Sequence, residues 1–302
     1  MSSSSLSDRE KAGLHGPVKM MVDEYSTTVF DRNGKTLEWR GNTSHGHVER
    51  TYVYDDNDRL IRVTGSAGDH EDKFRYDGRG KTQIRHVPQR PDQRSRAFGI
   101  FVWFDSISEG DSLSDGGTVE TTYNELDQPV EKRVFDDEGK LLFRVEYLHD
   151  ANGRLSEEKL ISENPPLPKA LRDQIPIEQR AAAIAEWKAK VEEISQRTGL
   201  FGNAGRAYVY TERGQIAERH MRMGAIREDL TFSYNECGDI SEWTMETSGL
   251  PYEASVQARP PLKCRRVYEY DSFGNWTSMS ETSESSGNET THTRIRQLSY
   301  HL

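Results

Sequence analysis

One stretch decides the fold of this chain: Tyr54-Asp55-Asp56-Asn57-Asp58-Arg59-Leu60. An aromatic residue closes one run of alternating residues, a polar turn follows, and an apolar residue opens a second run. Asp or Asn directly after the aromatic residue starts a turn, because its side chain accepts a hydrogen bond from the backbone two residues on. The fifth position requires a residue that tolerates positive φ, as the loop of a short hairpin does. We therefore interpret the unit as a β-hairpin.

The same unit recurs about nine times, at intervals of roughly 12 to 24 residues where no insertion intervenes. The fifth position is Gly in most copies. Asp58 and Asp127 replace it in two copies, and Asp tolerates the left-handed region better than most residues. The flanking runs are rich in residues that favour strands. The copies begin at Phe30, Tyr54, Tyr76, Tyr123, Phe135, His149, Tyr210, Tyr234 and Tyr270.

This repetition predicts a mainly β fold, a repetitive antiparallel hairpin meander that curves or coils, with one inserted amphipathic helix. Because the aromatic residues occupy one place in each hairpin, we expect them to form a ladder along one face. The chain is expected to divide into a disordered tail at 1–13, hairpin repeats at 14–163, a Pro-rich loop with a helical insertion at 164–203, and further repeats with a terminal strand at 204–302.

The helical insertion begins after several prolines, and Pro176 suits the first turn of a helix. Apolar residues then recur at three- and four-residue steps, which places them on one helical face. The face either packs on the sheet or docks a partner. Its candidates for partner binding are Ile184, Trp187 and Val191.

An earlier interruption, between the Tyr76 and Tyr123 copies, holds the most apolar run of the chain, Phe98-Gly99-Ile100-Phe101-Val102-Trp103-Phe104. The run is either a buried strand or an exposed patch for a ligand or partner. In the second case Phe101, Trp103 and Phe104 are the candidates for partner binding.

Trp39, Trp103, Trp243 and Trp276, together with the recurrent tyrosines, form either the core of a thin sheet or a flat recognition surface. A flat aromatic surface suits sugar rings as well as a protein partner. The candidates for carbohydrate binding are Trp39, Trp243 and Trp276.

The series Tyr54-Asp55, Tyr76-Asp77 and Tyr270-Asp271, with Gly four residues after the aromatic residue in most copies, resembles the YD-repeat (Rhs) family of bacterial proteins. The resemblance covers most of the chain from about Leu14 to Trp276. It implies a β-rich shell or spiral that encloses or presents another domain, often a toxin, or that contacts carbohydrate.

Of the 302 residues, 33% are hydrophobic and 30% are charged, which favours a thin, elongated sheet over a thick core. The formal net charge of -10 argues against nucleic acid and anionic membranes as partners. Met1 to Gly13 has no apolar segment of the kind a secretory signal needs, so the cytoplasm is the default location, with signal-independent secretion left open. Two cysteines, Cys237 and Cys264, are expected to be unpaired.

The sequence gives little support for a catalytic site or a metal site. His45 and His47 lie on one side of an extended backbone, but no further residue at ligand spacing completes a metal site. Cys237 lacks neighbours that would activate a nucleophile. We therefore predict no enzyme, no catalytic residues, no metal and no cofactor.

The function we expect from the sequence is that of a non-enzymatic recognition or scaffold protein that binds a protein partner. The alternative is a carbohydrate-binding repeat protein that uses an aromatic sheet face, and a second alternative is a shell-type fragment associated with a toxin system. A homo-oligomer is left open, because the edge strands of an open meander invite pairing with another chain.

Overall fold

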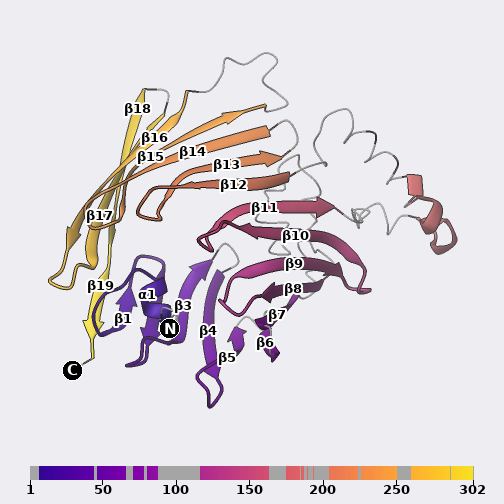
Figure 1. Cartoon of the computed structure of the whole chain (residues 1–302), viewed down its shortest axis with the longest axis horizontal. Coiled ribbons are helices and arrows are strands. Elements are labelled where there is room, and N and C mark those ends of the chain that lie inside the picture. Colours follow the sequence, from indigo (N-terminus) through magenta and orange to yellow (C-terminus); the bar gives the residue numbers. More distant parts are fainter. Residues whose placement is uncertain are drawn as a thin grey trace. The chain divides into compact units, whose positions relative to one another are not determined.

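The computed structural model has an antiparallel β architecture with short helical elements (Figure 1). The structure describes residues 7–43, 46–65, 71–77, 80–87, 116–162, 175–183, 185–186, 189, 193, 204–223, 226–249, 260–285 and 287–301. The predicted hairpin meander is confirmed, since each strand with a described partner pairs antiparallel with a neighbour in sequence or, for β1 and β19, across the chain ends.

The chain divides into two compact units. Unit 1 comprises Met1–Phe74, Phe232–Thr244 and Pro260–Leu302, and unit 2 comprises Arg75–Thr231 and Met245–Arg259. The elements in chain order are α1 (Asp8–Lys11), β1 (Val18–Val22), β2 (Ser26–Phe30), β3 (Thr36–Thr43), β4 (Gly46–Tyr54), β5 (Leu60–Gly65), β6 (Glu71–Asp77), β7 (Gly80–Val87), β8 (Gly117–Tyr123), β9 (Pro129–Asp136), β10 (Leu141–His149), β11 (Leu155–Ser162), the 3-10 turn η1 (Ile177–Gln179), β12 (Ala204–Tyr210), β13 (Ile216–Met223), β14 (Ile226–Tyr234), β15 (Ile240–Ser248), β16 (Leu262–Tyr270), β17 (Trp276–Ser285), β18 (Asn288–Ile295) and β19 (Gln297–Tyr300).

In unit 1, β1 pairs with both β2 and β19, so the two ends of the chain lie in neighbouring strands. Strands β2 to β6 continue in sequence order, and β16, β17 and β18 form a second run. In unit 2, strands β7 to β14 each pair antiparallel with the next.

Helical residues occur where the sequence predicts the inserted helix. The turn η1 follows Pro176, and the described residues 180–183, 185–186, 189 and 193 are α-helical. Helical structure also occurs at the N-terminus, within the segment expected to be a tail. There α1 has Ser7 as its N-cap, and the amide of Arg9 donates to the carbonyl of Gly34 at 2.9 Å. Residues 7–13 are therefore held against the Phe30 hairpin of unit 1.

The hairpin turns have the geometry that the repeat predicts. In the Phe30 copy the amide of Asp31 donates to the carbonyl of Lys35 at 2.9 Å, and the amide of Gly34 donates to the carbonyl of Asp31 at 3.1 Å. Asp58 and Asp127 have φ of 65° and 62°, so the left-handed residue is retained where Gly is replaced. The same pair of backbone bonds recurs in the turns that begin at Asp55, Asn124, Asp136, Asp150, Thr211, Asn235 and Asp271.

Antiparallel pairing places successive turns at opposite ends of the strands. The turns therefore form two rows, one along each of the two sides of the sheet where strands begin and end, and we call these sides edges. In unit 2 the turns of the Tyr123, His149 and Tyr210 copies connect β8–β9, β10–β11 and β12–β13, and they share one edge, which we call the ladder edge. The Phe135 copy connects β9 to β10 and lies at the opposite edge, which we call the insertion edge. It is a true hairpin that does not belong to the row of turns at the ladder edge.

Tyrosine hydroxyls join neighbouring turns within each unit. Three of them donate to the backbone carbonyl that opens the second strand of the preceding hairpin, which satisfies a carbonyl at the strand start. In unit 1 the pairs are Tyr54 with Thr36 at 2.9 Å and Tyr268 with Ile240 at 2.8 Å, and in unit 2 the pair is Tyr210 with Leu155 at 2.7 Å.

Cations cover the rings of three tyrosines that begin a repeat. The ammonium of Lys35 lies 5.2 Å from the ring centroid of Tyr54, and the ammonium of Lys81 lies 4.6 Å from that of Tyr123. The guanidinium of Arg154 lies 4.5 Å from the ring of Tyr210. Each cation is the sixth residue of its repeat, and each ring belongs to the neighbouring hairpin. The expected aromatic ladder is therefore built from alternating cations and rings as much as from ring pairs.

The apolar core is divided into small clusters. Unit 1 buries Leu14, Val18 and Phe30 together. Unit 2 has two clusters, one of Val119, Val134, Leu142 and Phe143, and one of Val145 and Met221. This agrees with the thin core that the low apolar content predicts.

Candidate functional site

The six residues predicted to bind a partner lie outside the residues whose side chains the structure describes. They are Phe101, Trp103, Phe104, Ile184, Trp187 and Val191. Their role stays a prediction, but the described strands fix where the two interruptions join the sheet.

Both interruptions join unit 2 at the insertion edge. One connects the end of β7 at Val87 to the start of β8 at Gly117, and the other connects the end of β11 at Ser162 to the start of β12 at Ala204. Strands β7 and β11 run in the same direction, because four antiparallel steps separate them. At about 4.8 Å per strand, the attachment points at β8 and β11 are roughly 14 Å apart.

The tryptophans named for carbohydrate binding lie in unit 1, each half-buried. The guanidinium of Arg50 lies 5.2 Å from the ring of Trp39. A Cβ added at Gly41 would come within 2.6 Å of the Trp39 indole, so the glycine makes room for that ring. Trp39 therefore has a packing role in the sheet.

Trp276 is packed in a similar way. The guanidinium of Arg296 lies 3.4 Å from its ring, and the ring of Tyr268 lies 6.2 Å away. Trp243 lies in β15, apart from this pair in sequence. Carbohydrate binding by the three residues stays a prediction.

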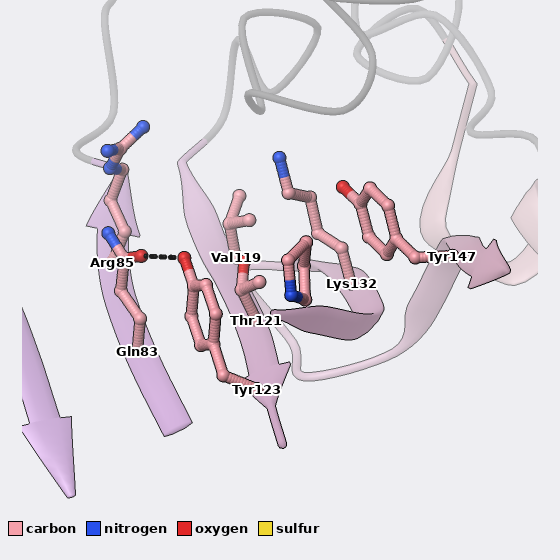
Figure 2. A pocket seen from close by; sticks show the side chains of 8 residues that line it. Gln83, Arg85, Val119, Thr121, Tyr123, Lys132 and Tyr147 are labelled. Carbon is pink, nitrogen blue, oxygen red and sulfur yellow. Dashed lines mark hydrogen bonds between the residues drawn. The ribbon is translucent and has the colours of Figure 1, made fainter. Parts of the chain in front are cut away.

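Unit 2 contains a cavity of about 280 Å³ on one face of strands β7 to β10 (Figure 2). The strand registers bring the lining together, since Arg85 pairs with Val119, Gln83 with Thr121, and Thr121 with Lys132. Alternate residues of a strand point to the same face, so all of these side chains project on one side. The lining residues are Gln83, Arg85, Val119, Thr121, Tyr123, Pro129, Lys132 and Tyr147.

The floor of the cavity is buried and its walls are polar. Val119 and Thr121 are 4% and 5% exposed. The hydroxyl of Tyr123 donates to Oε1 of Gln83 at 2.8 Å, which fixes the orientation of the amide. Figure 2 shows Arg85 and Lys132 extending on the same side of the sheet, with Tyr147 beside Lys132. None of the eight described lining residues is acidic.

Buried charges continue along this face of unit 2. Glu158 is 7% exposed and accepts a hydrogen bond from the hydroxyl of Tyr208. Burial, and then this bond to a carboxylate, raises the pKa of Tyr208 well above its ordinary range. Glu228 is 9% exposed and accepts from Arg219 at 3.1 Å. Strands β11 and β14 therefore carry buried, hydrogen-bonded carboxylates where a typical sheet would carry aliphatic residues.

Both cysteines are free, as expected. Cys237 is exposed, whereas Cys264 is buried, and its Sγ lies 3.1 Å from the hydroxyl of Ser283. Burial raises the pKa of the Cys264 thiol, which disfavours the reactive thiolate.

Within the described part of the chain, no group of three or more His, Cys, Asp or Glu residues is placed to hold a metal ion. Nor does any helix in that part have the length and apolar character to cross a membrane.

No family model and no curated protein matches the chain. Among solved structures, a porin-like protein from Bacteroides uniformis aligns at 9% identity over 95% of this chain and 99% of its own, with a TM-score of 0.43. A structure of TcdB2-TccC3-Cdc42 aligns at 13% identity over 94% of this chain and 17% of its own, with a TM-score of 0.26. A Photorhabdus luminescens Tc holotoxin pore aligns at 12% identity over 94% and 17%, with a TM-score of 0.21. These likenesses are too distant to assign a family or a function.

The sequence pattern located the turns but missed the cavity. Its residues come from four strands, and only the cross-strand registers bring them together. The available signal was the alternation of Gln83 with Arg85 and of Thr121 with Tyr123, each of which places two polar side chains on one face of a strand.

Proposed function

We propose that this chain is a non-enzymatic β-repeat scaffold that binds a protein partner through segments attached at the insertion edge of unit 2. One observation carries the proposal: the connections at 88–116 and 163–203, which hold the most apolar run and the amphipathic pattern of the sequence, join the sheet at the same edge.

The ladder edge supplies the rigid support that such a function needs. Its turns are tied to one another by the hydrogen bond from Tyr210 to Leu155, by the cation–ring contact of Arg154, and by a hydrogen bond from Gln128 to the carbonyl of Gly153. Binding residues in proteins are concentrated on loops that a rigid scaffold positions. Two apolar segments whose attachment points on the sheet are roughly 14 Å apart suit a single partner surface.

Relationship to the YD-repeat family is part of this proposal. The support for it is the turn chemistry, since most copies have an aromatic residue followed by Asp or Asn and then a left-handed fifth residue. The carbohydrate alternative has less support, because guanidinium groups cover the rings of Trp39 and Trp276.

The test compares variants with one charge added at each segment. Trp103→Asp and Val191→Asp target the two interruptions, and Val267→Asp is the matched control, since Val267 is a 71% exposed apolar residue of unit 1. Affinity capture from the source cells identifies a partner, which is then purified and titrated against each variant. We expect each of the first two substitutions to weaken binding by about tenfold or more and the control to leave it unchanged.

The melting temperature of each variant is measured in parallel, so that loss of binding is separated from loss of folding. A partner that binds all three variants equally well would refute the proposal. So would the absence of any partner together with turnover of a substrate that a His or Cys substitution abolishes, since that result would establish an enzyme.

A further inference from the structure

The cavity of unit 2 has a chemical character that differs from the rest of the chain. The protein has a formal net charge of -10, yet the eight described residues around the cavity include two cations, Arg85 and Lys132, and no acid. A guanidinium and an ammonium in one cavity are groups that hydrogen-bond strongly to anionic ligands.

The two cations suit a carboxylate. A guanidinium presents a planar fork of five N–H donors that matches the two oxygens of a carboxylate, and an ammonium adds three donors. This donor capacity lets both groups hold contacts within the protein and still bind a ligand. Figure 2 shows the two side chains extending on the same side of the sheet from strands β7 and β9, with Val119 of β8 between them.

The rest of the lining suits hydroxyl groups. Thr121 contributes a hydroxyl, and Gln83 contributes an amide whose orientation the bond from Tyr123 fixes at 2.8 Å. The tyrosines offer a flat apolar ring and a polar tip in one side chain. Lys81 lies 4.6 Å from the ring centroid of Tyr123, which holds that ring in place.

The size of the cavity limits the ligand. A volume of about 280 Å³ lies just below the usual range of ligand pockets, which is roughly 300 to 1,000 Å³. It accommodates a molecule of the size of a single sugar ring and excludes longer chains from full burial.

We propose that this cavity binds a small hydroxylated carboxylate, the class that includes uronic acids and other sugar acids. Arg85 and Lys132 bind the carboxylate, and Thr121 and Gln83 bind hydroxyl groups. This site lies on the face of the sheet, so the inference is independent of partner binding at the insertion edge.

The experiment is isothermal titration calorimetry of the full chain with D-glucuronate, D-glucose and acetate. The variants are Arg85→Gln and Lys132→Met, which remove one cation each. The control is Arg133→Gln, because Arg133 is the next residue of β9, points to the other face of the sheet, and pairs with Glu131 at 2.5 Å.

Wild-type protein is expected to bind glucuronate, and each cation variant is expected to bind it about tenfold or more weakly. Arg133→Gln is expected to bind as the wild type does, and glucose and acetate are expected to bind much more weakly than glucuronate. Lys132→Arg, which keeps the charge, is expected to retain binding, and the melting temperature of Lys132→Met separates loss of binding from loss of folding.

The proposal is overturned if wild-type protein does not bind glucuronate, or if both cation variants bind it unchanged. If acetate binds as tightly as glucuronate, the hydroxyl groups of the ligand do not contribute to affinity, and this result would also overturn the proposal. Equal binding of glucose would remove the role of the carboxylate, with the same consequence. Each of these results leaves the test of partner binding unaffected.

Discussion

Lys35 forms an ion pair with Asp58, the residue that replaces the turn glycine in the next hairpin of unit 1. In unit 2 Lys81 forms the same pair with Asp127, the other replacement. In both cases the lysine is the sixth residue of one repeat and the aspartate is the fifth residue of the next. In both repeats that have Asp instead of Gly at the left-handed fifth position, a lysine of the neighbouring repeat therefore forms an ion pair with that Asp.

Replacing Asp58 with Ala is expected to destabilise the protein by about 1–2 kcal/mol, because Ala at a φ of 65° is strained and also loses the ion pair. Asp58→Gly is expected to change stability by less than about 1 kcal/mol, since relief of strain offsets an ion pair that solvent screens. Urea unfolding measures both. Asp56→Ala, in the same turn and without positive φ, serves as the control. Equal losses for Ala and Gly would show that the backbone conformation is unimportant here.

Tyr54→Phe is expected to cost about 1–2 kcal/mol, because the hydroxyl bonds the carbonyl of Thr36 at 2.9 Å and the carboxylate of Asp8 at 2.8 Å. Asp8 also accepts from the amide of Thr36, so the loss should spread to α1. Hydrogen exchange should show faster exchange at the amides of Arg9 and Thr36. Tyr25→Phe, at a 50% exposed residue, is the control. Unchanged exchange at Arg9 would show that Tyr54 does not hold the N-terminal segment.

His220 should make stability depend on pH. Its ring nitrogens lie 2.7 Å from Asp229 and 2.9 Å from Glu218, and these carboxylates raise its pKa above the ordinary value of 6.5. A pKa that is raised by folding gives stability that is fully present below the unfolded value and is lost as pH rises through the folded value. The contribution is expected to be below about 1 kcal/mol, because all three side chains are nearly half exposed and solvent screens the pairs.

The measurement is an NMR titration of His220 together with unfolding of wild-type protein and His220→Gln at pH values below and above the transition. The variant should be less stable than wild type at the acidic end, and the difference should shrink at the alkaline end. Asp229→Asn should lower the pKa of His220. A difference that grows with pH would contradict the assignment.

Gly80→Ala is expected to destabilise the protein strongly. The residue has a φ of 145°, and an added Cβ would lie 2.0 Å from the carbonyl oxygen of Tyr123. We expect a loss of about 2–4 kcal/mol and displacement of Lys81 and Tyr123 beside the cavity. Gly139→Ala is the matched control: its φ is 77°, but nothing lies within 4 Å of the added atom, so the cost should be about 1 kcal/mol. Similar losses in both variants would rule out the steric contact as the cause.

The hairpins could be predicted from the sequence, because the types of five consecutive residues determine each turn. Asp58 and Asp127 could be assigned to the left-handed region from their position in the repeat alone. The edge at which a turn lies was not predictable in the same way. The Phe135 copy looks like the others, and only the count of strands places it at the insertion edge.

Longer-range relations were also beyond the local pattern. Asp8 lies in the segment that the sequence predicts to be a disordered tail, and its hydrogen bond with Tyr54 spans 46 residues. The cavity depends on the registers of β7 to β10, which a one-residue shift would destroy. A pattern of residue types within one strand does not specify which residues of the next strand lie opposite.

The alternation of turns in unit 2 limits how such a chain can lengthen. The linked turns follow β8, β10 and β12, so each hairpin that extends the row must bring two strands. A single added strand would reverse the direction of every strand after it and move the next tyrosine away from the carbonyl it binds. Duplication by whole pairs is then the route of growth that keeps these contacts, whereas changes of length between pairs are accommodated at the opposite edge.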